Sequence, residues 1–399
     1  MRKPDKQGDL ARVIYLDYAA TTPPDSRVMS VMQQELANVY GNASSLYSPG
    51  RTARSHVEKA RRQVASLLGA APSDIFFTSG GSESDNAALK GMAFARREEG
   101  LPCGILTSAV EHPAVLRTCE WLERQGFPVV YLPVDGDGRV SPEDLEAVLS
   151  VGFLAKEAIG IVSIMLANNE VGTIEPVKEL AAIAHDHGAD FHTDAVQAAG
   201  HIPIDVDALG IDALSLSGHK LYGPKGTGVL YVRRGVTIDP LIHGGAQERG
   251  LRAGTENVPA IAGLGCAAEI AQKELAGEAQ QLRRLKKILW DEISTIPGAF
   301  RNSPADDAQS LAGTLNFGIE GIRRGSLLIR LDRAGFAISA GSACSAGSLE
   351  PSHVLSAMGI PEDRAQSSLR VTLGRFTTED DVRAFAAALR SEAAAIRNA

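Results

Sequence analysis

Two segments that lie far apart in the chain carry a primary amine and a thiol in settings suited to chemistry. Ser217-Gly-His219-Lys220 places a lysine amine beside polar neighbours. More than a hundred residues later, Cys344 lies in a run of serine, alanine and glycine, residues 339–347, which has almost no side-chain bulk to hold it still. A lysine amine can hold a carbonyl cofactor, and a mobile thiolate is a strong nucleophile. Together the two groups favour chemistry that takes sulfur from an amino acid.

Lys220 directly follows the apolar stretch Ala213–Ser217, which is typical of a buried strand. Burial disfavours the charged ammonium form, so it lowers the pKa of the amine and makes it a better nucleophile toward a carbonyl group. Ser217 and His219 can add hydrogen bonds to a phosphate. The alternative is a surface lysine in a turn rich in glycine and proline, which describes Lys225 better than Lys220.

The segment 78–82 passes from an apolar strand through two glycines into a helix that begins near Ser82. Glycine lets the backbone approach a ligand closely, and the first turn of a helix presents free N–H groups. This predicts a phosphate site at Gly81 and Ser82. The alternative is a helix cap formed by Ser82, with Glu83 and Asp85 in the first turn. No Walker-type lysine follows, which argues against a nucleoside triphosphate.

Asp194, His112 and Asn169 each follow an apolar strand, at the sheet edge where α/β enzymes place their ligands. A carboxylate at position 194 can hold a protonated ring nitrogen, which pyridoxal phosphate needs to act as an electron sink. Gln197 would reach the same pocket. His112 is a candidate for stacking on a flat ring or for moving protons. Structural roles are the alternatives: a helix N-cap for Asp194, a structural histidine at 112 and a simple turn at Asn169.

The remaining candidates for chemistry divide into one arginine and three cysteines. Arg370 stands in an alternating strand pattern, where an inward-facing guanidinium would need an anion such as a substrate carboxylate. A surface arginine is the alternative. Cys103, Cys119 and Cys266 lie beside apolar residues and are expected to be inert, because their spacing matches no zinc site or disulfide framework.

Apolar strand patterns alternate with helical patterns through the first two thirds of the chain. The strands are expected at Ile75–Thr78, Gly104–Ser108, Val129–Leu132, Ile159–Leu166, Ala189–Thr193, Ala213–Ser217 and Gly228–Val232. Helical spacing is found at Asn86–Arg97 and Val177–His187. This alternation predicts an α/β fold with a mostly parallel sheet and helices on both faces.

The last third of the chain differs in pattern and predicts a smaller α+β domain. A long helix is expected over Asn257–Trp290, followed by short strands such as Leu369–Leu373 and helices such as Thr378–Arg390. We therefore expect a large cofactor-binding domain at 15–262. The smaller C-terminal domain would comprise 263–399 together with 1–14, and it would carry the Cys344 loop.

Composition and charge exclude several classes of function. The chain has 399 residues, of which 44% are hydrophobic, and its formal net charge is −8, which argues against nucleic acid as the main partner. The N-terminus has no apolar segment typical of a secretory signal, and no run of about 18 apolar residues predicts a membrane span. The scattered cysteines fit a reducing compartment, so a cytoplasmic location is expected.

The chain resembles the pyridoxal-phosphate-dependent cysteine desulfurases of the NifS/IscS type, a branch of the class V aminotransferase fold. The resemblance extends from Tyr15 to Thr378 and is most specific in three segments, Ser217–Gly226, Gly341–Cys344 and Arg252–Asn257. It implies the PLP-transferase fold, which is like that of aspartate aminotransferase. That fold has a large domain with a mostly parallel mixed sheet and a smaller α+β C-terminal domain.

The resemblance also implies a role for each matching residue. Lys220 would hold the pyridoxal 5′-phosphate aldehyde, His112 would stack on the ring and transfer protons, and Cys344 would receive the sulfur. Asp194 would hold the ring nitrogen, Gln197 the ring hydroxyl, and Asn169 and Arg370 the substrate carboxylate. The implied phosphate ligands are Gly81, Ser82, Ser217, His219 and, from a partner subunit, Thr255.

The implied reaction removes sulfur from L-cysteine through a ketimine of the cofactor and gives L-alanine and a Cys344 persulfide. The implied partners are a second copy of the chain, in a homodimer, and a sulfur-acceptor protein. An iron–sulfur cluster scaffold and a tRNA-thiolation carrier both fit the acceptor. The alternatives are a selenocysteine lyase, another class V aminotransferase or lyase, and a scaffold or sensor that keeps the fold without turnover. Failure to bind pyridoxal phosphate would favour that last alternative.

Overall fold

A seven-stranded sheet is the centre of the computed structural model, which describes residues 13–151, 158–341 and 351–398. Its strands, in spatial order, are β2 (Ile75–Thr78), β8 (Gly228–Val232), β7 (Ala213–Ser217), β6 (Asp190–Asp194), β5 (Ile159–Ser163), β3 (Gly104–Ser108) and β4 (Val129–Leu132). Strands β4, β3, β5, β6 and β7 are parallel to one another, and β8 is antiparallel to both of its neighbours. The predicted mostly parallel sheet is confirmed.

Five of the seven strands have the bounds that the sequence predicts, and two differ slightly. Strand β5 ends at Ser163 rather than Leu166, and β6 is shifted by one residue to Asp190–Asp194. Residues 164–166 remain buried after leaving the sheet, so their apolar character does not mark the end of the strand.

Helices cover both faces of this sheet, as expected. They are α1 (Ser26–Asn38), α2 (Ser48–Leu68), α3 (Gly81–Glu98), α4 (Pro113–Arg124), α5 (Pro142–Ser150), α6 (Val177–Asp186) and the short α7 (Val206–Leu209). Helices α3 and α4 pack on one face against Ile105 and Ile161, whereas α2 and α6 share a core with Leu106 and Val162 on the other. Successive strand residues point to opposite faces, so both faces are apolar and buried.

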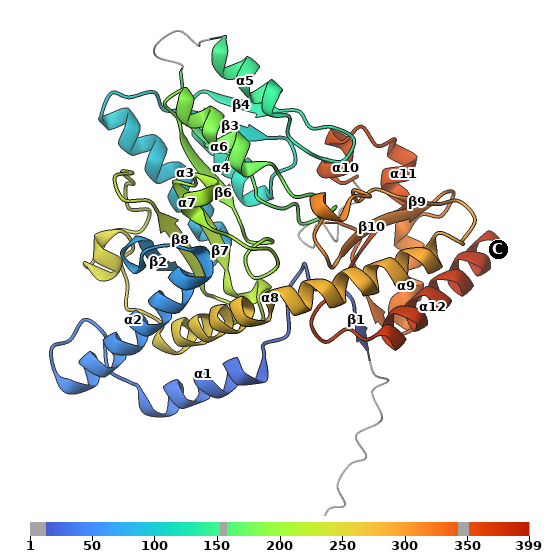
Figure 1. Cartoon of the computed structure of the whole chain (residues 1–399), viewed down its shortest axis with the longest axis horizontal. Helices are drawn as coiled ribbons and strands as arrows, with labels where there is room; N and C mark the ends of the chain where they lie inside the picture. The colour runs from blue at the N-terminus through green and yellow to red at the C-terminus, as the bar shows by residue number, and fades with distance from the viewer. Residues whose placement is uncertain (1–12, 152–157, 342–350, 399) are drawn as a thin grey trace, which may run out of the picture.

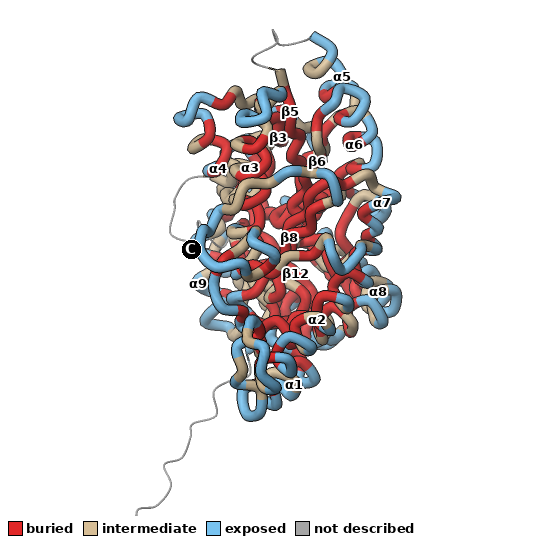
Figure 2. Tube along the Cα trace, turned by 90° about the vertical axis from the view of Figure 1, so that its left-hand side faces the viewer, coloured by how far each residue is buried: buried red, intermediate tan, exposed pale blue. Residues whose placement is uncertain are grey.

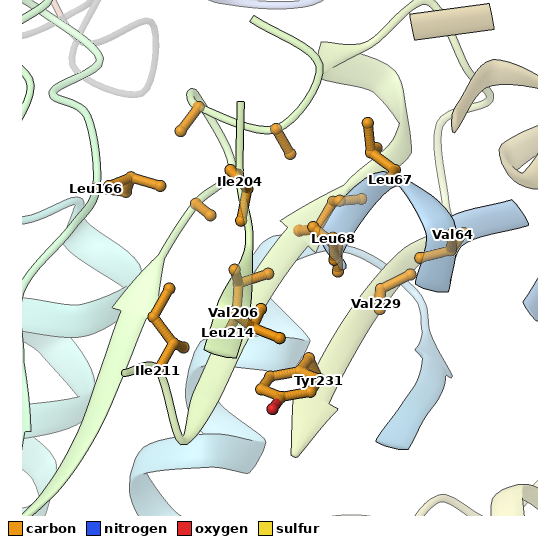
Figure 3. Packing of buried hydrophobic residues seen from close by; sticks show 14 of the residues in the cluster. Val64, Leu67, Leu68, Leu166, Ile204, Val206, Ile211, Leu214, Val229 and Tyr231 are labelled. Atoms are coloured by element: carbon orange, nitrogen blue, oxygen red, sulfur yellow. The ribbon is translucent and has the colours of Figure 1, made fainter. Parts of the chain in front are cut away.

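The core on the α2 side is continuous from helix to strand. Figure 3 shows Val64, Leu67 and Leu68 of α2 close to Val229 and Tyr231 of β8. Figure 2 shows the same arrangement for the whole chain, with buried backbone through the sheet and exposed turns of α1, α5 and α9 around it. This rigid sheet fixes where the polar residues at its strand ends lie.

The helix α8 (Val258–Ile293) runs from the large sheet to a second, smaller group of elements (Figure 1). These elements are β9 (Ala299–Arg301), β10 (Thr314–Ile319), α9 (Arg324–Arg333), β11 (Phe336–Ala337), α10 (His353–Ala357), α11 (Glu362–Ser367), β12 (Ser368–Thr372) and α12 (Glu379–Arg397). Strands β12, β10 and β9 form an antiparallel sheet, and β11 pairs with β1 (Ile14–Tyr15) from the start of the described chain.

The expected long helix is confirmed, and α8 joins the two hydrophobic cores. Its first half, including Leu264, packs in the core of the large sheet, and its second half, including Leu285, packs in the core of the smaller group. The division of the chain between residues 262 and 263 stays a prediction, because α8 is continuous through that point. None of the helices in the described part of the chain is long and apolar enough to cross a lipid bilayer.

Candidate active site

A cavity of about 230 Å³ lies where β5, β6 and β7 end. Its walls come from the N-terminal segment, the start of α3, the loops after the strands, and β12. Ten residues predicted for the site line it: Gly81, Ser82, His112, Asn169, Asp194, Gln197, Ser217, His219, Lys220 and Arg370. The fold therefore brings together side chains that are separated by up to several hundred residues in the sequence.

One end of the cavity is suited to an anion. Helix α3 begins at Gly81 after Gly80, and no side chain caps it, so the N–H groups of its first turn are open to a ligand. The alternative in which Ser82 caps this helix is therefore wrong. A Cβ at position 81 would come within 2.6 Å of the Val196 Cγ2 atom, so glycine allows this close approach.

Two side chains after β7 complete the anion-binding end. Ser217 is the last residue of β7, and His219 lies in the single turn of 3-10 helix that follows. Burial, together with the nearby Lys220 and Lys225, lowers the pKa of His219 to about 4, so its ring is neutral at pH 7. The His219 Nδ1 atom lies 3.1 Å from the Thr21 hydroxyl.

Lys220 directs its amine into the cavity from this same turn. Its Nζ atom donates hydrogen bonds to the carbonyl oxygens of Ala19, at 2.5 Å, and Ala20, at 2.9 Å. These bonds hold the tip of a long side chain that would otherwise sample many rotamers. Lys225 is exposed, as the sequence predicts, so the alternative of a surface lysine describes that residue and not Lys220.

Asp194 is a buried carboxyl group at the end of β6. Its Oδ1 atom accepts a hydrogen bond of 2.8 Å from the Val196 N–H. Burial raises its pKa, and the nearby His112 and Lys220 oppose that rise. The alternative in which Asp194 caps a following helix is wrong, because residues 195–200 form turns instead. Gln197 in these turns donates to the Ala19 carbonyl oxygen at 3.0 Å.

His112 combines a structural position with a place in the cavity wall. It is the N-cap of α4, and its Nδ1 atom accepts a hydrogen bond of 3.1 Å from the Ala114 N–H. The neutral ring therefore carries its proton on Nε2. Burial lowers the pKa of His112 below 6.5, although Asp194 opposes this effect. His112 therefore has the structural role that was its alternative, as the N-cap of α4, and it also lines the cavity.

Arg370 faces inward from β12 and is 1% exposed, so the alternative of a surface arginine is wrong. Its Nη1 atom donates to the Asn169 carbonyl oxygen and its Nη2 atom to Asp17 Oδ1, both at 2.8 Å. Its Nε atom has no hydrogen-bond partner among the described residues. A buried guanidinium with a spare donor beside a cavity is suited to an incoming carboxylate.

One predicted site residue lies outside this cavity, and another lies outside the described residues. Thr255 lines a separate cavity of about 190 Å³ together with Arg252 and Glu256. Cys344 lies outside the described residues. The chain that leads to it is held beside Arg370, because Ser339 exchanges two backbone hydrogen bonds with Arg370, at 2.7 and 3.2 Å.

The other three cysteines lie outside the cavity and are unpaired. Burial raises the pKa of the Cys119 thiol to about 12 and also raises the pKa of Cys103 and of Cys266. Thiols with raised pKa values are poor nucleophiles at neutral pH. These findings support the expectation that the three cysteines are inert.

Several lining residues were missed by sequence reasoning, namely Ala19, Ala20, Asp85, Met165 and Val196. Asp85 had a detectable signal, because it lies on the same side of α3 as the apolar Ala88 and Met92, where a charged residue is unusual. The two alanines act through their carbonyl oxygens, and no side-chain pattern reveals such a role.

The polar groups of the cavity fit pyridoxal 5′-phosphate. The uncapped start of α3 can hold a phosphate, and Lys220 offers an amine to the aldehyde. Asp194, whose ionised form the nearby His112 and Lys220 favour, can hold a ring nitrogen. This set of groups meets the phosphate, the aldehyde and the ring of the cofactor.

Comparisons with known proteins agree with this geometry. The family model described as Aminotransferase class-V matches residues 14–385. A protein of Methanosarcina thermophila, Cysteine desulfurase IscS, is 49% identical over 371 residues, which cover 93% of this chain and 89% of the relative. A solved structure of a NifS-like protein has a TM-score of 0.88 and 40% identity, and the match covers 96% of this chain and 99% of that one. A structure of SspA in complex with cysteine has a TM-score of 0.78 and 38% identity over 91% of this chain and 99% of that one.

Proposed function

The chain belongs to the class V aminotransferases and, within them, to the cysteine desulfurases, and from this premise we propose that it takes sulfur from L-cysteine and releases L-alanine. The observation that carries the proposal is a single cavity in which the Lys220 amine, the Asp194 carboxyl group and the uncapped start of α3 meet. The enzyme depends on pyridoxal 5′-phosphate, as its family does.

Pyridoxal phosphate supplies an aldehyde that takes up the amine of an amino acid and a ring that draws electrons from its α-carbon. The Lys220 amine would hold the aldehyde. The first turn of α3 with Ser82 would hold the phosphate, together with Ser217 and His219. Asp194 would hold the ring nitrogen and Gln197 the ring hydroxyl. The resemblance to the desulfurases implies these roles, and the common place of the residues in one cavity wall supports them.

The substrate carboxylate binds between Arg370 and Asn169. The Nε atom of Arg370 has no partner among the described residues, so a carboxylate would complete its hydrogen bonding. Asp17 already bonds Nη2 and keeps the guanidinium plane fixed. An arginine held in this way selects an α-carboxylate at one position and so orients the rest of the amino acid.

Lys220 and His112 move protons between the α-carbon of the substrate and its neighbouring atoms. The neutral ring of His112, which has its proton on Nε2, can donate that proton, so the base of the pair is the Lys220 amine. The Lys220 amine would act as this base while the cofactor carries the substrate. The Ala19 and Ala20 carbonyl oxygens then receive its hydrogen bonds and keep it close to the reacting atoms.

Cys344, in its thiolate form, is the acceptor of the substrate sulfur. The S–S bond forms between Cys344 Sγ and the substrate sulfur while the Cβ–S bond of the substrate breaks. The electron pair of the broken bond remains on Cβ, which takes up a proton and becomes the methyl group of alanine. The two sulfur atoms are oxidised to a persulfide as the carbon is reduced. Cys344 is five positions after Ser339, which pairs with Arg370 of the cavity wall, and five residues span at most about 17 Å, so Sγ is within reach of the cavity.

The test is to mix the holoenzyme with L-cysteine and to assay alanine, sulfide and protein-bound persulfide together. Cys344→Ala is expected to keep the yellow cofactor band and to lose alanine formation by at least about 100-fold, because the nucleophile is absent. Lys220→Ala is expected to lose the yellow band of the enzyme. Cys266→Ala, which removes a thiol away from the cavity, is the matched control and should keep full turnover.

Full cysteine turnover by Cys344→Ala would overturn the sulfur-transfer role. Parallel assays with L-selenocysteine separate a desulfurase from a selenocysteine lyase, since only the desulfurase needs the thiol. A requirement for an added keto acid would indicate an aminotransferase instead.

We also propose a homodimer in which the partner subunit's Thr255 contributes to the phosphate site. Its support is that Thr255 lines a different cavity from the other phosphate ligands of its own chain. Mixing Thr255→Ala with Lys220→Ala subunits tests this, because a mixed dimer should contain one site without either change. No recovery of activity above that of the separate variants, in dimers shown to have exchanged, would contradict it.

The persulfide is passed to a sulfur-acceptor protein, either an iron–sulfur scaffold or a tRNA-thiolation carrier. The unpaired cysteines support a reducing, cytoplasmic location for this transfer. Incubation of the persulfide form with each kind of acceptor, followed by mass measurement of the acceptor, would distinguish the two.

A further inference from the structure

Asp85 is a carboxyl group in the cavity wall that has no role in the proposed reaction. It lies in the second turn of α3, is 1% exposed, and lines the same cavity as Asp194 and Lys220. Its Oδ1 atom has no hydrogen-bond partner among the described residues. A buried polar atom left unpaired in a native structure usually marks a functional constraint.

Asp85 and Asp194 lie too close to be ionised independently. One oxygen of each lies, together with one ring nitrogen of His112, in a group whose atoms are all within 4.8 Å of one another. Both carboxyl groups are shielded from water, so two negative charges at this separation repel each other strongly. Buried carboxyl pairs of this kind hold one proton between them.

The surroundings decide which of the two carboxyl groups keeps the proton. Asp194 accepts a hydrogen bond from the Val196 N–H, and the nearby His112 and Lys220 favour its ionised form. The charges that face Asp85 are those of Asp194 and of Glu111, which precedes α4, and both raise its pKa beyond the effect of burial.

Ser215 and His192 are two further neighbours of Asp85. Ser215 of β7 favours the ionised form of Asp85. His192 of β6, whose Nε2 atom lies 3.9 Å from Asp85 Oδ1, has a pKa of about 3 because it is fully buried, so it carries no charge at pH 7. The His192 ring is held between the Ser163 hydroxyl, at 2.8 Å, and the Ser215 hydroxyl, at 3.1 Å.

We propose that Asp85 is a positioning residue that keeps the proton of the pair and donates it in a hydrogen bond to Asp194, so that Asp194 stays ionised opposite the ring nitrogen of the cofactor. The inference rests on the proposed function, because it needs a pyridoxal ring in this cavity. Asp85 does not touch the reacting atoms in this role. It acts on the cofactor through Asp194.

The experiment compares two ligands of the cofactor-free protein. One is pyridoxal 5′-phosphate, and the other is 1-deazapyridoxal 5′-phosphate, which has a carbon in place of the ring nitrogen. Asp85→Ala should raise the Kd of pyridoxal phosphate about 10-fold and change that of the deaza analogue less than about 3-fold, because it removes the donor that favours the ionised form of Asp194, and only the first ligand pairs with that carboxylate. Asp85→Asn, which stays neutral and keeps a donor, should bind both ligands within about 3-fold of the wild type.

Two further variants keep the comparison independent of folding. Glu175→Ala removes another buried carboxyl group with an unpaired oxygen, 3% exposed and outside the cavity, and should lower the thermal midpoint without changing either Kd more than about 2-fold. If Asp85→Ala does not fold, Asp85→Val, which also lacks a donor, takes its place, and its loss should again be confined to the ligand with a ring nitrogen.

Equal weakening of both ligands by Asp85→Ala would show a merely structural role and overturn the inference. A loss of about 10-fold or more in Asp85→Asn, confined to pyridoxal phosphate, would show that Asp85 acts as an anion and would also overturn it. Neither of these two results would contradict the proposed function, because the wild type would still turn over cysteine. Failure of the wild type to bind either ligand would instead contradict the proposed function.

Discussion

Arg61 in α2 and Arg370 in β12 are both buried guanidinium groups, but they are paired to different degrees. Arg61 donates to both carboxylate oxygens of Glu248, at 2.7 and 2.9 Å, and to the Ile75 carbonyl oxygen, and its Nε atom faces Glu58. Arg370 bonds Asp17 and the Asn169 carbonyl oxygen, and its Nε atom is unpaired within the described part of the chain.

This difference separates a region that serves stability from a region that receives a ligand. Around Arg61, the Glu248 carboxylate also accepts the Phe77 N–H, so the buried charges are fully bonded by the chain itself. Around Arg370, an unpaired donor and the unpaired Asp85 oxygen border one cavity. Burial alone therefore does not reveal a binding site, whereas buried polar groups that lack a hydrogen-bond partner beside a cavity indicate one.

The largest expected effect is on the stability of the Arg61 region. Arg61→Met should lower the free energy of unfolding by about 3–5 kcal/mol, because the Glu248 carboxylate is left buried without its partner. Denaturant unfolding measures this. Arg62→Met, at an exposed position of the same helix, is the control and should cost no more than about 1 kcal/mol. A fall in kcat/KM of folded Arg61→Met beyond about 3-fold would remove the distinction between the two regions.

The next effect is on substrate recognition by Arg370. Arg370→Met should lower kcat/KM for L-cysteine about 100-fold, mainly through KM, because a charge-assisted bond to the substrate carboxylate is lost. The Kd of pyridoxal phosphate should change less than about 3-fold. Arg375→Met, which breaks pairs with Asp25 and Glu278 outside the cavity, is the matched control for turnover. The same loss in both variants would contradict a specific role for Arg370.

The cavity region should also respond to acid through His192. Burial holds the pKa of this residue at about 3 in the folded state, below its value of about 6.5 in an unfolded chain. The unfolded chain therefore binds the proton first as pH falls, so this contribution to stability is complete above pH 6.5 and is lost progressively toward pH 3.

At pH 5 the loss should reach about 2 kcal/mol, at about 1.4 kcal/mol per pH unit. Unfolding curves at pH 7.5, 6 and 5 measure it, and His192→Gln should show a smaller change over this range. An identical pH dependence in the variant would exclude His192 as the source.

The smallest expected effect concerns the half-buried ion pair between Arg252 and Glu83, at 2.9 Å. Glu83 lies in the first turn of α3, and without its partner its charge would repel a bound phosphate. Arg252→Gln should therefore raise the Kd of pyridoxal phosphate about 2–5-fold at low salt and less at about 1 M salt. Adding Glu83→Gln should restore the Kd of pyridoxal phosphate toward that of the wild type. A double variant with the same raised Kd as Arg252→Gln would argue against this electrostatic cause.

Much of the fold was predictable because the strands are short apolar runs bounded by glycine, proline and polar residues. Strands β2, β3, β4, β7 and β8 have the predicted bounds for this reason. Lys220 and Asp194 were identifiable because each ends such a run. The predicted roles of the site residues stay predictions. Their common place in one cavity, for all but Thr255 and Cys344, is what the structure adds.

The local sequence pattern did not predict the contributions of Asp17, Ala19, Ala20 and Asp85. Ala19 and Ala20 act through backbone carbonyl oxygens, which every residue has. Asp17 contacts a residue more than three hundred positions away in the sequence, so no local pattern relates the two. The local pattern around Asp85 predicts only a place in the first turn of a helix. Its distance from Asp194 depends on how α3 packs on the sheet, so the sequence does not reveal the pair.

The amino-acid sequence by itself determined the order of strands and helices and the chemical groups at the strand ends, because hydrophobic periodicity and turn residues act over a few positions. Only the tertiary structure decided which buried charges are complete and which are left open to a ligand. That outcome depends on distances between residues remote in the chain, such as Arg370 and Asp17 or Arg61 and Glu248, and packing of the whole molecule sets those distances.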